Sequence, residues 1–260
     1  MPVHTYRRSP FLHTQENDAF DRLCRLCSEH LQSKGDVRVI GNVKVGQFEL
    51  DALVLSPRSI TIIDFKNYGG TIAISENYLW TTNDGTEIKA GAHYLNPFKQ
   101  VSRYKRGLIE WLGSVSQANE TEALTHISGL VLFTQSVELK RSRDSFSPKA
   151  DKWFQTGGYR EGLKWLCDVA SNRLFLDSAE LDNIIKMLGA LPFQPSKVDQ
   201  IAIDVKDALD RVFRDMEDAR MQDWYAQNAE RVEEQNKLYI EDERIRFEQH
   251  KAGKFLPKKH

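Results

Sequence analysis

The sequence predicts an α/β domain that is followed by a charged helical extension. Apolar residues recur at helical spacing over residues 14–34, and the spacing changes to the alternation of β-strands between residues 36 and 90. The helical period returns over residues 95–113, and an apolar strand follows at residues 127–137. This pattern in a chain of 260 residues is typical of one large domain with an appended helical part.

The composition is that of a soluble globular protein, with 40% hydrophobic and 28% charged residues. The stretch "MPVHTYRRSPF" lacks the apolar core of a signal peptide, and no stretch approaches the roughly 18 apolar residues that a membrane helix needs. We therefore expect a cytoplasmic protein with no membrane contact. The net charge of −1 neither indicates nor excludes a nucleic-acid binder, because phosphate attraction depends on where the charges lie.

The first predicted helix spans residues 14–34. Thr14 is a suitable N-cap, and Gly35 a suitable terminator. Glu16 falls in the first turn, where the helix dipole favours an acid.

The three cysteines, an odd number, argue against a secreted disulfide framework. Cys24 and Cys27 are three residues apart on the apolar stripe of the first helix, which favours core packing. The alternative is a metal–thiolate site with Cys167 as a third ligand, although such sites usually need about four ligands.

Strand-like segments follow the first helix. They are "DVRVIGNVKVG", "FELDALVL", "SITIIDFKN" and "TIAISENYLWTTNDGTEIKAG". A turn with Pro57 at its centre joins the second and third segments, and Asn83 to Gly85 form a hairpin turn within the fourth. The sheet is therefore expected to begin as a mostly antiparallel meander.

The second half of the domain is predicted to be more helical. Asn96 is a good N-cap for the next helix, Pro97 suits its first position, and Gly113 closes it. Residues 138–160 are polar and basic and are interpreted as a loop. Two short helices follow, "YREGLKWLCDVA" and "SAELDNIIKMLGAL", the second with Ser178 as its cap.

The composition changes after "PFQPSKV". Residues 198–250 contain no proline or glycine and are heavily charged, which predicts a long exposed helix or a coiled-coil-like arm. The expected organisation is a domain over residues 1–195, an arm over 196–250 and a basic disordered tail over 251–260.

Acidic residues and a lysine lie on neighbouring strands of the predicted meander. Asp51 lies in "FELDALVL", on the same strand face as Glu49, and Asp64 and Lys66 share one face of the next strand. If these faces coincide, the like charges repel unless a cation lies between them. Hard oxygen ligands of this kind suit Mg²⁺ or Mn²⁺, which can support phosphodiester hydrolysis. Asp64 and Lys66 alone are also compatible with a structural ion pair.

The order of these residues resembles the PD-(D/E)XK nuclease superfamily, and "FELDALVL…ITIIDFKNYGG" is similar to its nuclease-related domain family, NERD. The resemblance covers roughly residues 12–135 and includes "QVSRY" in the following helix. It implies a restriction-endonuclease-like core, with a mixed central sheet flanked by helices, and a C-terminal helical extension. Leu50 stands where the superfamily motif has proline, and Asp64 stands where glutamate is commoner.

The resemblance also implies roles for individual residues. Asp51, Asp64 and the backbone carbonyl of Phe65 would hold the metal, and Glu16 would contribute directly or through water. Lys66 would orient or activate the attacking water.

Further site residues lie on the helix after the strands. Gln100 and Tyr104 match the Q-x3-Y element of related nucleases, which implies contact with the metal-site waters or with DNA, Gln100 as a catalytic residue and Tyr104 as a nucleic-acid contact. Four residues apart on one helix, the two side chains face the same way. Basic residues on that helix could hold the phosphate backbone, or they could be ordinary solvated surface. These are Lys99, Arg103, Lys105 and Arg106.

The implied function is Mg²⁺- or Mn²⁺-dependent hydrolysis of DNA, in bacterial DNA processing or defence against foreign DNA. The alternative is a catalytically silent nucleic-acid-binding or assembly module of the same fold, which acts through its C-terminal helical arm. The expected partners are DNA and, through that arm, a second copy of the chain or a helicase or ATPase. Such a motor would be a separate chain, because the sequence contains no G-x-x-x-x-G-K-[ST] motif.

Overall fold

The computed structural model describes residues 3–91, 94–115, 126–141 and 145–196, together with residues 216, 219, 220 and 228. One compact unit spans Met1–Pro195. The predicted arm and tail lie outside the described residues, apart from Ser196 and the four isolated positions. Within the described part of the chain, no helix combines the length and the apolar character needed to cross a membrane.

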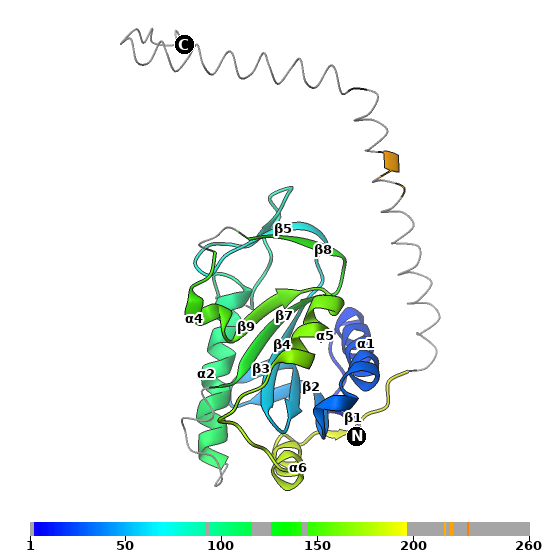
Figure 1. Ribbon diagram of the computed structural model, residues 1–260, viewed down its shortest axis with the longest axis vertical. Coiled ribbons are helices and arrows are strands. Elements are labelled where there is room, and N and C mark those ends of the chain that lie inside the picture. The colour runs from blue at the N-terminus through cyan, green and yellow to red at the C-terminus, as the bar shows by residue number, and fades with distance from the viewer. Residues whose placement is uncertain are drawn as a thin grey trace. The chain divides into compact units, whose positions relative to one another are not determined.

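A mixed sheet forms the centre of the compact unit (Figure 1). In the described residues it consists of β1 (Val3–Arg7), β2 (Val37–Val45), β3 (Phe48–Ser56), β4 (Ser59–Lys66), β7 (Ser128–Phe133), β9 (Phe154–Gly157) and β10 (Leu191–Pro192). The strand order is β10-β1-β2-β3-β4-β7-β9. β2, β3 and β4 form an antiparallel meander, whereas β7 pairs in parallel with both β4 and β9. The predicted mixed central sheet is confirmed.

Helices cover both faces of this sheet (Figure 1). α1 (Thr14–His30) and α5 (Tyr159–Asp168) pack on one face, and α2 (Pro97–Val115) packs on the other. The α1-side core includes Phe20, Leu23, Ala52, Ile63 and Leu130, and the α2-side core includes Leu53, Ile60, Ile62, Val101 and Leu108. All eight residues of β4 are buried, as expected for a strand that is covered on both faces.

The N-terminal end of α2 is fixed by Asn96, as predicted. Asn96 Oδ1 accepts a hydrogen bond from the backbone N–H of Lys99 at 2.9 Å, and Pro97 is the first helical residue. Gly113 does not close the helix, which continues to Val115. A glycine inside a helix costs only about 1 kcal/mol, which packing elsewhere on α2 can offset.

Two helix starts differ from the prediction by one residue. Thr14 is the first residue of α1, and His13 takes the N-cap position. α6 (Ser178–Met187) is capped by Asp177, not by Ser178. The Asp177 carboxylate accepts from the N–H of Glu180 at 2.8 Å, and the Glu180 carboxylate accepts from the N–H of Asp177 at 2.9 Å. This reciprocal pair satisfies two backbone donors, which a lone hydroxyl at Ser178 would not do.

α1 ends at His30, before the predicted boundary, and a 3-10 turn η1 (Gln32–Lys34) leads to Gly35. Cys24 and Cys27 are free thiols in the core beneath α1, as their helical spacing predicts. Burial raises the pKa of both thiols, so they remain protonated.

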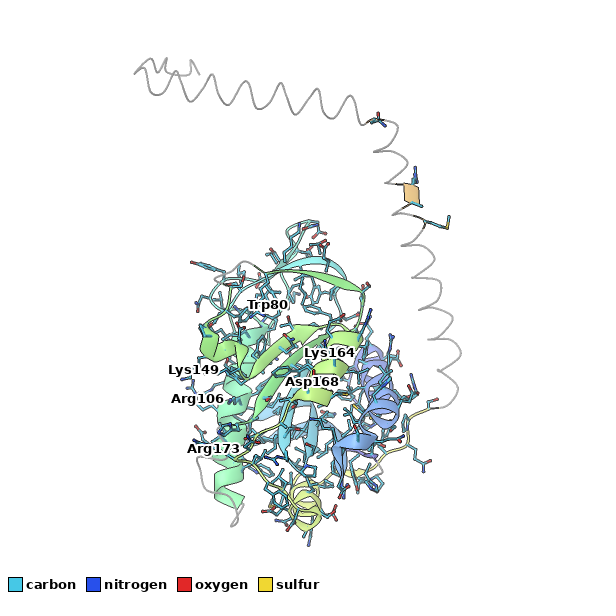
Figure 2. The ribbon with its side chains drawn as sticks, in the orientation of Figure 1. Trp80, Arg106, Lys149, Lys164, Asp168 and Arg173 are labelled. Atoms are coloured by element: carbon cyan, nitrogen blue, oxygen red, sulfur yellow. The ribbon has the colours of Figure 1, made fainter. Side chains whose placement is uncertain are left out.

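Residues 138–160 are not a loop, contrary to the prediction. They contain most of β8 (Val137–Arg141), α4 (Pro148–Asp151) and β9. β8 pairs in parallel with β5 (Gly70–Ile74), which also pairs with β6 (Thr81–Thr82), giving a small sheet in the order β6-β5-β8. Trp80, labelled in Figure 2, is fully buried beneath this sheet. Elements of four or five residues are too short to show a period in a basic sequence.

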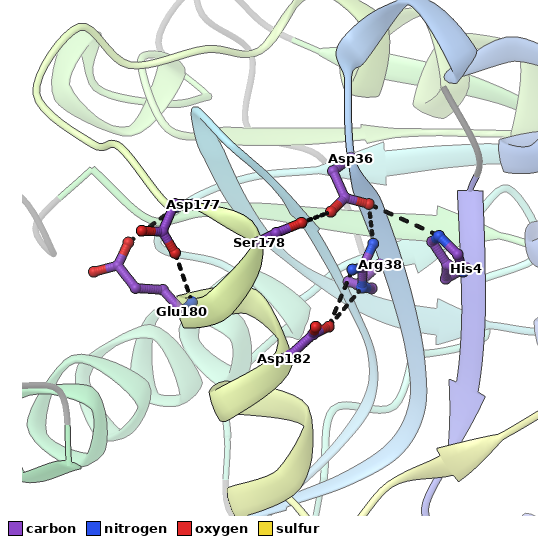
Figure 3. Close-up of polar contacts among 7 residues, drawn as sticks. All are labelled: His4, Asp36, Arg38, Asp177, Ser178, Glu180 and Asp182. Atoms are coloured by element: carbon purple, nitrogen blue, oxygen red, sulfur yellow. Dashed lines mark hydrogen bonds and ion pairs between the residues drawn. The ribbon is translucent and has the colours of Figure 1, made fainter.

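A buried arginine joins α6 to the start of β2 (Figure 3). Arg38 is 5% exposed, and its Nη2 donates to Asp182 Oδ1 on α6 at 3.0 Å. Arg38 also pairs with Asp36, whose carboxylate accepts from the hydroxyl of Ser178. His4 Nε2 on β1 lies 3.9 Å from Asp36 Oδ1. This network connects β1, β2 and α6.

Gly41 of β2 lies against Phe20 of α1, and a Cβ at position 41 would lie 2.6 Å from the ring. We expect Gly41→Ala to lower the free energy of unfolding by about 1–3 kcal/mol, the usual cost of overpacking a core. In the control Gly113→Ala, the added methyl group meets nothing within 4 Å outside its own helix. That change should raise the free energy of unfolding by about 0.5–1 kcal/mol. Urea denaturation measures the free energy of unfolding of both variants. Equal changes in the two variants would contradict the close packing of α1 on β2.

Candidate active site

The hydrogen-bonded ladder between β3 and β4 ends next to two acidic residues. The last pair in register is Ala52 with Ile63. Beyond it, the side chain of Asp51 replaces the β3 backbone, and its Oδ2 accepts from the N–H of Phe65 at 2.6 Å. The N–H and C=O of one strand residue point to the same side, so the Phe65 carbonyl is also directed toward β3.

The alternation of β3 side chains slips by one residue at Asp51. Leu50 packs in the α2-side core, but Ala52 packs in the α1-side core although it is two residues away. On β2, the corresponding position is Asn42, which has a φ of 51°. Asparagine tolerates this left-handed conformation better than most residues. Because of the slip, the Asp51 side chain does not point to either face of the sheet in the usual alternation and instead reaches the Phe65 N–H of β4.

Glu49 does not share a strand face with Asp51, contrary to the prediction. Phe48 and Leu50 both pack with the α2-side core, so the intervening Glu49 points to the opposite side and is exposed. The slip at Asp51 is the physical reason for the difference.

Asp64 and Lys66 lie side by side at the end of β4. Asp64 is 1% exposed and Lys66 is 9% exposed, and Lys66 Nζ lies 2.9 Å from Asp64 Oδ2. Ile60 and Ile62 lie on the same strand face and pack in the α2-side core. The ion pair therefore continues a buried apolar surface and does not lie on a solvated face of the sheet.

α2 presents Gln100 and Tyr104 toward this pair, one helical turn apart, as their spacing predicts. Gln100 Oε1 accepts from Lys66 Nζ at 3.3 Å and from the backbone N–H of Gly91 at 2.9 Å. Gln100 Nε2 donates to the Tyr104 hydroxyl at 2.8 Å. Lys66 is thus held by Asp64 on its own strand and by Gln100 on the facing helix.

Burial and mutual repulsion perturb the carboxylates. Burial first, and then the charge of Asp64, raise the pKa of Asp51 to about 7, against the opposing effects of Lys66 and of the Phe65 N–H. Burial also raises the pKa of Asp64, against the attraction of Lys66. Burial alone would lower the pKa of Lys66, but the two acids outweigh it and raise that pKa above its usual value. One lysine cation therefore faces two acids.

Glu16 lies half-buried in the first turn of α1, and its charge further raises the pKa of Asp51. Among the residues that the structure describes, no three His, Cys, Asp or Glu side chains form a group able to hold a metal ion. The carboxylates that the site brings together are Asp51 and Asp64. Mg²⁺ commonly uses one or two carboxylates and keeps several waters, so these two acids and the Phe65 carbonyl fit such an ion.

The predicted nucleic-acid contacts Arg103 and Arg106 are exposed on α2, where Figure 2 labels Arg106. The Arg103 guanidinium lies 5.6 Å from the ring centre of Phe48, next to the Tyr104 ring. Tyr104 itself is half-buried, with its hydroxyl bonded to Gln100.

The two lysines of α2 are more engaged than the arginines. Lys99 Nζ donates to Asn77 Oδ1 at 2.9 Å. Lys105 Nζ lies 4.4 Å from the ring centre of Trp153, and burial, aided by the charge of Lys149, lowers the pKa of Lys105 to about 8. Of this basic set, Arg103 and Arg106 keep the fullest contact with solvent.

Asn67, which follows Lys66, is a site residue that sequence reasoning missed. Its Nδ2 donates to Gln15 Oε1 at 2.6 Å in the first turn of α1. Its Oδ1 accepts from Thr134 Oγ1 at 2.8 Å and from Gln135 Nε2 at 3.0 Å, just beyond β7. The available signal was a polar residue directly after the D-x-K pattern, at the end of a strand.

The mixed central sheet with helices on both faces is compatible with a restriction-endonuclease-like nuclease fold. Residues 15–134 match the family model of NERD, the nuclease-related domain. This part of the chain is therefore a nuclease-related domain, and the predicted family is confirmed. No curated protein and no solved structure matches the chain.

The stability of the metal-free protein should fall as the pH rises from 5 to 8. Asp51 ionises near pH 4 when unfolded and near pH 7 when folded. A raised pKa gives stability that is complete below the unfolded pKa and is lost as the pH rises through the folded one. We expect the free energy of unfolding, measured with urea in EDTA, to be lower at pH 8 than at pH 5 by roughly 2–3 kcal/mol.

Asp51→Asn should remove most of that difference and stabilise the metal-free protein at pH 8. Asparagine can still accept the Phe65 N–H but carries no charge. The exposed Glu49→Gln is the matched control and should retain the difference. A pH dependence that persists in Asp51→Asn would show that another group carries it.

Proposed function

We propose that this protein is a metal-dependent nuclease that hydrolyses DNA phosphodiester bonds. The observation that carries the proposal is the convergence of Asp51, Asp64 and Lys66 at the point where β3 leaves β4. Asp64 is buried and Asp51 is half-buried, and a single lysine only partly offsets their repulsion, so a divalent cation would balance them best.

Asp51, Asp64 and the backbone carbonyl of Phe65 would hold Mg²⁺ or Mn²⁺, and Glu16 would contribute through a water molecule. When bound, the ion would supply Lewis-acid activation of water and of the scissile phosphate. Asn67 holds the first turn of α1 against the ends of β4 and β7, and so sets where Glu16 lies relative to the two strands.

Lys66 orients the reactants in this proposal. Its raised pKa keeps Nζ protonated at neutral pH, so it donates hydrogen bonds and does not take up a proton. An ammonium group has three N–H donors. Gln100 accepts from one at 3.3 Å, and Asp64 forms an ion pair with Nζ at 2.9 Å, so Nζ would still have an N–H for the attacking water or a phosphate oxygen.

The DNA backbone would pass along α2. Arg103 and Arg106 offer exposed guanidinium groups to phosphates, and Lys99 and Tyr104 lie on the same helix. Phosphate contacts of this kind position a substrate and carry no sequence information.

We further propose that the enzyme works in the bacterial cytoplasm, in DNA processing or in defence against foreign DNA. The charged segment at residues 196–250 would bind a second copy of the chain or a separate helicase or ATPase. Its high charge and its lack of proline and glycine between residues 198 and 250 support a helical arm. The alternative, a silent nucleic-acid-binding or assembly module, predicts binding without cleavage.

Nicking of supercoiled plasmid in Mg²⁺ or Mn²⁺ tests the proposal. We expect Asp64→Asn and Lys66→Met to reduce the rate at least about 100-fold, because each removes a charge that acts on the transition state. Glu49→Gln removes an exposed acid two residues from Asp51 and should cleave at the wild-type rate.

Thermal unfolding of each variant shows whether lost cleavage reflects lost folding, since an unpaired buried charge is destabilising. Cleavage that persists in both variants, or that proceeds equally in EDTA, would contradict the assignment of the site. Metal-independent DNA binding without cleavage in either ion would favour the silent module.

A further inference from the structure

A cavity of about 550 Å³ opens at the small sheet, outside the Asp51 and Lys66 site. It is lined by Ala73 and Ile74 of β5, by Ser75 and Tyr78 in the segment that follows β5, and by Lys140 and Arg141 of β8. Its volume lies within the range of about 300–1,000 Å³ that is usual for ligand sites. Neither the family match nor the acid–lysine chemistry gives this cavity a role.

The cavity combines an aromatic ring with positive charge. Tyr78 is 75% exposed, so its ring is accessible to a ligand. Arg141 pairs with Asp151 and lies 4.6 Å from the ring centre of Phe146, so part of its charge is already balanced. Lys140 is exposed next to it. Tyr78 and the two cations thus line the same cavity, and an aromatic ring together with positive charge is the combination that binds bases and phosphates of single-stranded nucleic acid.

The wall of the cavity is rigidly held. The carbonyl of Ser75 accepts from Trp80 Nε1 at 2.6 Å and from Asn96 Nδ2 at 3.1 Å. Asn96 Nδ2 also donates to the carbonyl of Tyr78 at 2.8 Å. Trp80 is fully buried, and Figure 2 shows it beneath the small sheet. The segment that presents Tyr78 is therefore pre-organised, and ordering it on binding costs little.

The same asparagine connects the cavity to the candidate active site. Asn96 caps α2, and Gln100, which holds Lys66, lies four residues further along that helix. Four residues of α-helix rise about 6 Å, so the residue that holds the Tyr78 carbonyl lies about one helical turn from the residue that holds Lys66. Lys99 lies between them and is bonded to Asn77, next to Tyr78 in the chain.

We propose that the cavity binds an unpaired nucleotide of the DNA strand that the enzyme cleaves. The base stacks on Tyr78, and the adjoining phosphate pairs with Lys140. A base in a duplex has both faces covered by its neighbours, so only an unpaired base can use the ring. The inference rests on the proposed function, and it names single-stranded DNA, or an unpaired end, as the preferred substrate class.

Fluorescence anisotropy of the full chain tests the proposal in EDTA, with a labelled single-stranded oligonucleotide and a duplex of equal length. Tyr78→Ala should weaken single-strand binding about 5- to 100-fold, the usual effect of losing one stacked base. Tyr78→Phe keeps the ring and should bind as the wild type does. Lys140→Gln should lower the slope of log affinity against log salt by about 0.7, the loss of one phosphate contact.

Two exposed residues outside the cavity provide matched controls. Phe175→Ala removes a 67% exposed ring, and Lys164→Gln removes an exposed cation from α5 (Figure 2). Neither should change single-strand binding. Thermal unfolding should be the same for Tyr78→Ala and the wild type, because an exposed side chain adds little to the core.

Unchanged binding in Tyr78→Ala, equal losses in Phe175→Ala, or a wild type that prefers the duplex would overturn the inference. Binding in EDTA is independent of cleavage, so the two proposals fail separately. Normal nicking together with unchanged single-strand binding by Tyr78→Ala would contradict the nucleotide site and leave the nuclease proposal intact. Tyr78-dependent binding without nicking would contradict the nuclease activity and leave the nucleotide site.

Discussion

The whole site depends on one exchange of hydrogen-bond partners, in which the Asp51 carboxylate takes the Phe65 N–H in place of the β3 backbone. A buried N–H needs a partner, so β3 can leave β4 only where a side chain replaces the missing carbonyl. A carboxylate accepts this bond strongly and brings a negative charge to the end of β4, beside Asp64. The same contact therefore sets where β3 separates from β4 and places the Asp51 charge beside Asp64.

The rest of the site compensates for that charge. Lys66 offsets it in part, and its ammonium group contacts both Asp64 and Gln100. Gln100 is in turn held by Gly91 and by Tyr104, so α2 carries the second half of the arrangement. The charge that Lys66 leaves unbalanced lowers the stability of the protein at high pH, as the raised pKa of Asp51 indicates.

Local chemistry made much of this site predictable. Asn96 as a cap, and Gln100 and Tyr104 as neighbours on a helix, follow from spacing alone, and the acid–lysine pattern follows from two adjacent strands. Features that depend on distant contacts were not predictable. The slip at Asp51 needs Asn42 in a left-handed conformation, and that side chain is held by the carbonyl of Pro10. β8, α4 and β9 were missed because short basic elements show no period.

The position of α5 and β9 has a consequence for how this domain can be divided. β9 pairs with the edge of β7, and α5 packs so closely on β7 that a Cβ on Gly162 would lie 2.9 Å from Leu132. Both elements lie beyond residue 134, where the family match ends. A chain cut at that boundary would expose an apolar strand with unpaired backbone groups, a template for aggregation. The segment that matches the family model is thus smaller than the compact unit, which extends to Pro195.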